Sequence, residues 1–250
     1  MRVSIAADTA RLRQDLERER DRLTRVTRRV VYELAHRAVA DIKADMPRTF
    51  DRPTPWVVNG VYVSPLRAEN SATVDWKPGS AGSVPAEKIL RAQIEGGQRN
   101  LKRFERLFAL RPGYSVVPGK WADLDQYGNI KPSQLVQILS FLRLFSEVGF
   151  TANRSRRLRN RGRRTRAGAE YFIRPIGATQ ASHPDTWHLP PGVYRVSPSQ
   201  GDAPLLVLAF VRAARYRPRF APARIVRETV ARDATEVWNL GLARQLPFRR

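Results

Sequence analysis

Residues 8–45 read DTARLRQDLERERDRLTRVTRRVVYELAHRAVADIKAD. Apolar side chains recur in this stretch at steps of three and four residues, the spacing of one face of an α-helix. They are Leu12, Leu16, Leu23, Val26, Val30, Leu34, Ala38 and Ile42. Charges of both signs fill the other faces, and no proline or glycine interrupts the stretch before Pro47. The pattern predicts one long helix within residues 1–46, with Asp8 as its N-cap.

The apolar stripe of this helix is narrow, as it is in helices that pack along a partner. Leu16, Leu23 and Val30 fall at seven-residue steps and can therefore form one seam between helices. We expect these three residues to lie at a subunit interface, and the protein to be a homo-oligomer. The alternative is that the helix lies on a sheet of its own chain, and the pattern alone does not decide between the two.

Beyond Pro47 the sequence alternates between strand-like and helix-like segments. Segments rich in β-branched and aromatic residues predict strands. They are residues 56–58 with 61–63, and then 72–76, 170–174, 192–197 and 205–212. Amphipathic segments and glycine stops predict helices. They are residues 86–95, 98–110, 132–148 and 222–246, whereas residues 111–127 are expected to be a loop.

These elements predict an α+β fold with one antiparallel sheet. The long N-terminal helix and the C-terminal helix are expected to flank this sheet. We expect a single domain over residues 1–250, with residues 86–168 as a mostly helical insertion that ends in an arginine-rich loop.

Charge is the strongest signal in the composition. The chain has 45 Lys and Arg against 23 Asp and Glu, a net charge of +22. Such a surface repels its own copies unless an acidic partner neutralises it. Eight arginines lie within thirteen residues and carry no apolar pattern, so we expect them to bind DNA or another polyanion. They are Arg154, Arg156, Arg157, Arg159, Arg161, Arg163, Arg164 and Arg166.

Residues for catalysis or metal binding are sparse. The chain has no cysteine and three histidines, and neither a secretion signal nor a membrane-spanning segment is recognisable. His183, Asp185 and His188 lie close together, but their spacing matches no metal motif. Asp123 and Asp125 are expected to form a turn rather than an acid–base pair. We therefore expect no enzyme, no cofactor and no metal, although a nuclease with scattered acidic residues stays open.

Four strings, in this order, carry a family resemblance. They are IEGGQRNLKRFE at residues 94–105, WADLDQYGNIKPSQLVQILSFLR at 121–143, LPPGVYRV at 189–196 and LAFVRAARYRPRF at 208–220. Together they resemble prophage-encoded tail proteins of the minor tail protein Z, or tail-completion, family of long-tailed phages. The resemblance spans about residues 53–246.

The resemblance implies a structural virion protein, made in the bacterial cytoplasm and assembled into the tail or neck. It implies that the protein completes the head-proximal end of the tail and joins the tail to the head. The partners implied are copies of itself in a hexameric ring, the tail terminator or tube, the head connector and the DNA in the channel, without a membrane. The alternative is a free, nonspecific nucleic-acid-binding protein that uses the same arginines.

Overall fold

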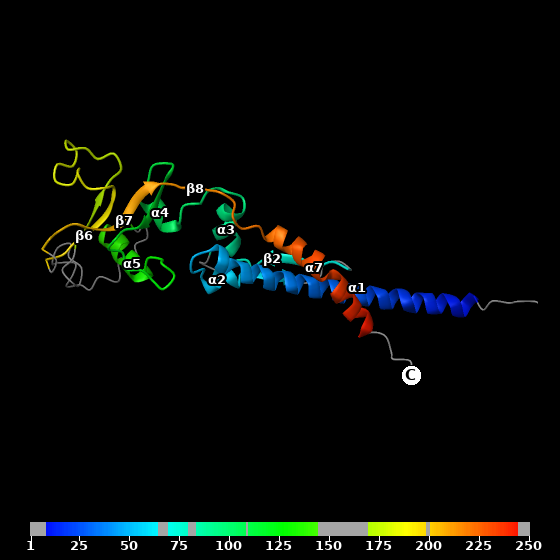
Figure 1. Ribbon diagram of the computed structural model, residues 1–250. Coiled ribbons are helices and arrows are strands. Elements are labelled where there is room, and N and C mark those ends of the chain that lie inside the picture. The colour runs from blue at the N-terminus through cyan, green and yellow to red at the C-terminus, as the bar shows by residue number, and fades with distance from the viewer. Residues whose placement is uncertain are drawn as a thin grey trace, which may run out of the picture. The chain divides into compact units, whose positions relative to one another are not determined.

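The computed structural model divides the chain into two compact units (Figure 1). The first consists of Met1–Gly96 with Arg217–Arg250, and the second of Gly97–Tyr216. The residues described are 9–64, 70–79, 84–108, 110–144, 170–198 and 201–244. The mixed α+β class is confirmed, with a long N-terminal helix, a C-terminal helix and antiparallel sheets.

The first unit is built on helix α1, Thr9–Thr49, which confirms the predicted long helix. The helix passes through Pro47 and ends soon after it. Its buried side chains begin only at Val26 and continue to Met46. Helix α7, Pro222–Ala243, lies along this later part of α1, and the earlier part extends beyond the end of α7 (Figure 1). We call residues 9–25 the exposed half of α1 and residues 26–49 its covered half.

The covered half and α7 run antiparallel, because the last residues of α7 meet the first residues of the covered half. Val237 packs in one cluster with Val26, Val30 and Leu34. A Cβ atom added at Gly241 would lie 2.9 Å from a methyl group of Val30. The absence of a side chain at this position therefore lets the last turn of α7 approach α1 closely.

A polar network joins the same two helices further along. Thr229 donates its hydroxyl proton to Asp41 at 2.6 Å, and Arg232 reaches Asp41 at 2.8 Å and Asp233 at 2.7 Å. The hydrogen bonds from Thr229 and Arg232 hold the pKa of Asp41 below its ordinary value. Arg37 lies 3.5 Å from Asp233, so charges from both helices meet here.

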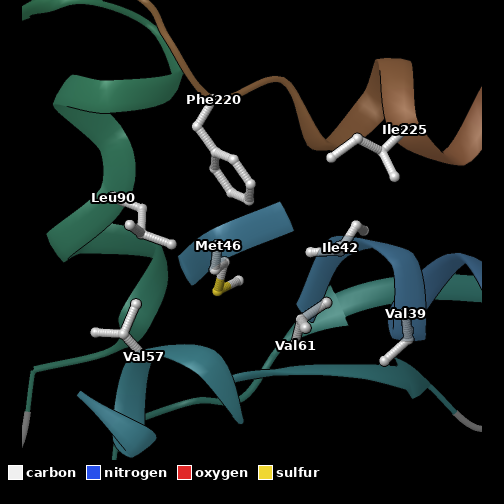
Figure 2. Packing of buried hydrophobic residues seen from close by; sticks show 8 residues of the cluster. All are labelled: Val39, Ile42, Met46, Val57, Val61, Leu90, Phe220 and Ile225. Atoms are coloured by element: carbon white, nitrogen blue, oxygen red, sulfur yellow. The ribbon is translucent and has the colours of Figure 1, made fainter. Parts of the chain in front are cut away.

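The main core of the first unit lies at the other end of the covered half (Figure 2). Ile42 and Met46 are fully buried there, together with Leu90 and Phe220. Strands β1, Val61–Ser64, and β2, Thr73–Trp76, form an antiparallel hairpin in which Val61 pairs with Trp76. Both strands contact α1. The flanking helices are α2, Pro55–Val58, and α3, Ala86–Ile94.

One predicted strand of this unit is wrong. Residues 56–58 form the short helix α2 instead, and only the part after Gly60 is extended. Pro55 stands at the first helical position, where its fixed φ angle favours a helix and its missing N–H costs nothing. Val57 and Val58 donate their N–H groups to the carbonyl of Thr54, which closes the turn.

The second unit contains a four-stranded antiparallel sheet of order β4-β7-β6-β5. Its strands are β4, Tyr114–Pro118, β5, Glu170–Arg174, β6, Gly192–Val196, and β7, Leu205–Arg212. A core around Val193, Val207 and Leu208 includes Ile138 of helix α5, Pro132–Phe141. Helix α4, Arg103–Leu107, and the two-residue strands β3, Gly97–Gln98, and β8, Arg215–Tyr216, complete the described elements.

One expectation about this region is wrong. The predicted loop at residues 111–127 contains β4, which is short and bounded by Gly113 and Pro118 but pairs with β7 along its whole length. The insertion expected at residues 86–168 stays a prediction, and the compact unit Gly97–Tyr216 has other bounds. Helix α3 belongs to the first unit because Leu90 is buried in its core, while β5, β6 and β7 complete the sheet of the second.

Candidate functional site

The predicted polyanion-binding residues all lie outside the described part of the chain. This applies to Arg154, Arg156, Arg157, Arg159, Arg161, Arg163, Arg164 and Arg166. Their role as a DNA-binding segment therefore stays a prediction from the sequence. The described residues on either side of them, Leu144 and Glu170, both belong to the second unit.

The described chain resumes in β5, the edge strand of the four-stranded sheet. Tyr171 of this strand is buried, and its ring meets that of Phe141 in α5 at a centroid distance of 5.7 Å. Burial raises the pKa of the Tyr171 hydroxyl, and Arg195, its partner across the sheet, opposes that shift. The strand that follows the arginine-rich segment is thus well packed on the core of its unit.

A buried ion pair fixes the other edge of this sheet. The carboxylate of Glu105 is fully buried and accepts hydrogen bonds from Arg99 at 2.6 and 2.7 Å. The backbone N–H groups of Lys102 and Val116 also donate to it. These donors outweigh the burial and keep the pKa of Glu105 below its ordinary value. All its acceptor positions serve the fold, so the group is not a free acid for catalysis.

The histidine-containing loop is held by a buried arginine. Arg174, which is buried, donates to the backbone carbonyls of Pro175, Ala178 and Trp187. His183 contacts the hydroxyl of Ser182 at 3.0 Å. Among the described residues, no three His, Asp or Glu side chains are grouped closely enough to hold a metal ion.

The paired aspartates form a turn, as the sequence predicts. Asp125 accepts hydrogen bonds from the backbone N–H groups of Tyr127 and Asn129, at 2.9 and 2.8 Å. Gly128 adopts a φ of 78°, which a residue with a side chain rarely takes. The backbone of Asp123 accepts from Lys131 and closes the same loop.

The predicted seam residues separate into two groups. Leu16 and Leu23 are 61% and 47% exposed, and Leu12 on the same face is 57% exposed. Val30 is only 6% exposed because it packs against Val237 of α7 within the same chain. Leu12, Leu16 and Leu23 are therefore the residues of this stripe that are available to another molecule, and we call them the leucine row.

A second apolar surface lies in the first unit. A groove of about 590 Å³ runs between α1, the β1–β2 hairpin and α7. The residues that line it include Leu34, Ile42, Trp76, Val226 and Val230. Among its described residues, the first unit thus offers the leucine row and this groove as apolar surfaces. The seven-residue spacing indicates the leucine row in part, whereas nothing in the sequence indicates the groove.

Comparison of the chain with protein-family models, with curated proteins and with solved structures found no match. Within the described residues, no helix is long and apolar enough to cross a membrane. The proposal for function therefore rests on the residues themselves.

Proposed function

We propose that this chain is a structural protein of a tailed bacteriophage particle that completes the head-proximal end of the tail and joins it to the head around the DNA channel. The observation that carries the proposal is the leucine row on the exposed half of α1. Three leucines about half exposed on one helix face are an apolar surface that water disfavours, and such surfaces mark protein contacts. A protein built for assembly has this feature, whereas a free enzyme gains nothing from it.

Charge supports the same proposal. The second unit carries 20 Lys and Arg against 7 Asp and Glu, and it includes the arginine-rich segment. Nonspecific contact with DNA needs basic side chains that meet phosphates without reading bases. A ring around a DNA channel provides such contact, and the DNA relieves the repulsion between the basic copies.

The order of the four family-like strings adds further support. It favours a tail-completion protein over a free, nonspecific nucleic-acid-binding protein, which would explain the arginines but not the leucine row. The proposed partners are further copies of this chain in a sixfold ring, the tail terminator or tube and the head connector. In this proposal the protein acts within the virion as a non-enzymatic component without cofactor or membrane.

Deletion of the gene, followed by electron microscopy of the lysate, tests the proposal. We expect filled heads and tails of normal length that are rarely joined, and a large loss of infectious particles. Normal infectivity without the protein would overturn the proposal. Empty heads alone would indicate DNA packaging, and metal-dependent cleavage of DNA by the purified protein would indicate a nuclease.

A further inference from the structure

We infer that residues 1–8 of one copy add a strand to β2 in the groove of a neighbouring copy. The inference rests on the proposed function in one respect, the assembly of several copies, and it names the segment and the surface that make a contact between them. We call residues 1–8 the donor segment. The acceptor is the groove of the first unit.

The groove lies along the outer edge of β2. The residues of the hairpin that line it are Val61, Ala72, Thr73, Val74 and Trp76. All of them except Val61 belong to β2 or directly precede it. Among the described residues that line the groove, Thr73 alone is polar. Helix α7 lines it from Pro222 to Val230, which is about 12 Å of helix and the length of about four strand residues.

The backbone of β2 is unpaired on this side. The N–H group of Lys77 donates to the carbonyl of Gly60 at 2.7 Å. The alternation of an antiparallel ladder then directs the backbone groups of Val74 and Trp76 away from β1. The N–H group of Trp76 donates to the side chain of Asp75 at 2.7 Å. Within the described part of the chain, neither backbone group of Val74 has a hydrogen-bond partner on this edge.

Strand β4 of the second unit shows how this chain closes an edge. The N–H group of Val116 donates to Glu105 at 2.8 Å, and Arg99 donates to the carbonyl of Val116 at 3.2 Å. Two side chains thus take the place of a neighbouring strand, and they protect the edge from pairing with another chain. At Val74 the edge is open and lies beside an apolar groove, which is the arrangement to which an extended peptide adds as a further strand.

The donor segment has the pattern of such a strand. It reads MRVSIAAD and precedes the described part of the chain. Its odd positions are all apolar, and they are Met1, Val3, Ile5 and Ala7. Arg2, Ser4 and Asp8 are polar and stand at even positions. This alternation is typical of a strand with one buried face, and valine and isoleucine favour strands. The apolar face therefore suits the groove.

The donor segment is too short to reach the groove of its own chain. Ile5 lies four residues before Thr9, which is at most about 14 Å even for a fully extended chain. Val31 is the first residue of α1 that lines the groove, and it lies about 33 Å from Thr9 along the helix. The exposed half of α1 therefore presents the donor segment to another copy.

The sequence after α7 fits the open edge less well. Residues 245–250 read QLPFRR and also lie outside the described part of the chain. Pro247 has no N–H group to donate to a strand ladder. Arg249 and Arg250 would meet no acidic residue among those that line the groove.

A contact between the donor segment and the groove joins two different surfaces of the chain. Such head-to-tail contacts generate rings when the rotation between copies closes. Each groove is then completed by the neighbouring copy, as the proposed ring requires. The same contact explains why α1 continues beyond the end of α7.

A pair of cysteines in one chain tests the inference, since the chain has no cysteine of its own. Ser4→Cys is combined with Thr73→Cys, because both residues would lie on the outer face of the added strand and β2. Mild oxidation should give a series of disulfide-linked oligomers. Ser4→Cys combined with Lys88→Cys is the matched control, because Lys88 is exposed in the same unit but does not line the groove.

Two outcomes of this oxidation would overturn the inference. A disulfide within one chain, seen as a monomer of higher mobility in a non-reducing gel, would place the donor segment on its own groove. Oligomers no more abundant than those of the Lys88→Cys control would mean that the donor segment does not meet β2 of another copy. Circular dichroism checks that both variants are folded.

Charges placed on the two faces of the donor segment give a second readout. Val3→Asp with Ile5→Asp should weaken self-association by about tenfold or more in sedimentation velocity, because two carboxylates would enter an apolar groove. Ser4→Asp with Ala6→Asp adds the same charge to the other face and should change self-association by less than about twofold. Equal losses from the two pairs would contradict a strand with one buried face.

Failure of the inference and failure of the proposed function are distinguishable. Absence of the disulfide-linked oligomers, combined with unjoined heads and tails in the deletion lysate, would remove the inference and leave the function. Disulfide-linked oligomers of a protein whose deletion leaves infectivity unchanged would do the reverse.

Discussion

The two halves of α1 share one helix and one apolar spacing, yet only one of them is buried. In the covered half, Val26 and Ile42 have no exposed surface, and α7, the hairpin and α3 pack around that segment. In the exposed half, Leu12, Leu16 and Leu23 occupy equivalent positions on the helix and remain in solvent. Periodicity therefore identifies the face of a helix that needs a partner, but it does not say which molecule provides that partner.

A charge placed in each half of α1 should affect the buried and the exposed part differently. Val30→Asp puts a carboxylate between α1 and α7 and should cost about 3 kcal/mol or more of the free energy of unfolding. Leu23→Asp should leave that free energy within about 0.5 kcal/mol, because its side chain is exposed. Urea unfolding followed by circular dichroism measures both.

The effect on self-association should be larger for Leu23→Asp than for Val30→Asp, the reverse of the effect on stability. Leu23→Asp should abolish self-association in light scattering while the protein stays folded. A loss of fold in Leu23→Asp would mean that the exposed half packs within its own chain, and the comparison would fail.

Substitutions in the arginine-rich segment should separate contact with DNA from contact with protein. Replacing its eight arginines by glutamine should reduce the slope of log affinity against log salt for duplex DNA, by about 0.9 for each phosphate that is no longer neutralised. Leu23→Asp should leave the slope for a single copy unchanged. An unchanged slope in the glutamine variant would mean that the segment meets another partner, such as an acidic protein ring.

The end of α7 offers a smaller perturbation of the covered half. Gly241→Leu should cost about 1–3 kcal/mol, because its Cβ would meet Val30 at 2.9 Å and separate the helices. Asn239→Leu, on an exposed position of the same turn, is the control and should change stability by less than about 0.5 kcal/mol. Equal effects of the two substitutions in thermal unfolding would argue against close packing at Gly241.

Acid should affect the covered half slightly. The pKa of Asp41 is lowered by Thr229 and Arg232, so its contribution is complete above the ordinary pKa of about 4. It is lost as the pH falls through the lower folded value. Because Asp41 is partly exposed to solvent, it contributes less than about 1 kcal/mol to the free energy of unfolding. Asp41→Asn should remove this part of the pH dependence of the free energy of unfolding between pH 5 and 2. Asp15→Asn, in the exposed half, should leave it in place.

Local patterns in the sequence predict some elements better than others. The long helix, the C-terminal helix and the strands at 170–174 and 205–212 follow from periodicity and β-branched residues, and they are confirmed. Strand β4 escapes such patterns because its five residues gain their extended form from pairing with β7, almost a hundred positions away. The sequence of helix α2 resembles that of a strand because valine favours strands. The local conformation is helical because Pro55 favours the start of a helix.

The candidate site is predictable only in part, for a related reason. The seven-residue spacing indicates Leu16, Leu23 and Val30 as equivalent, and only the place where α7 ends separates Val30 from the other two. The buried pair Arg99 and Glu105 carries no signal of its own, since an arginine and a glutamate six positions apart are common on a surface. Burial depends on contacts between residues that are distant in the sequence, and a local pattern carries no information about such contacts.

We propose that the exposed half of α1 is kept free for assembly of the head–tail joint. The most direct test adds purified protein to a lysate that lacks it and counts joined, infectious particles. Wild-type protein should restore joining, whereas the folded variant with Leu16→Asp and Leu23→Asp should leave filled heads beside complete tails. Equal restoration by that variant and by the wild type would contradict the account.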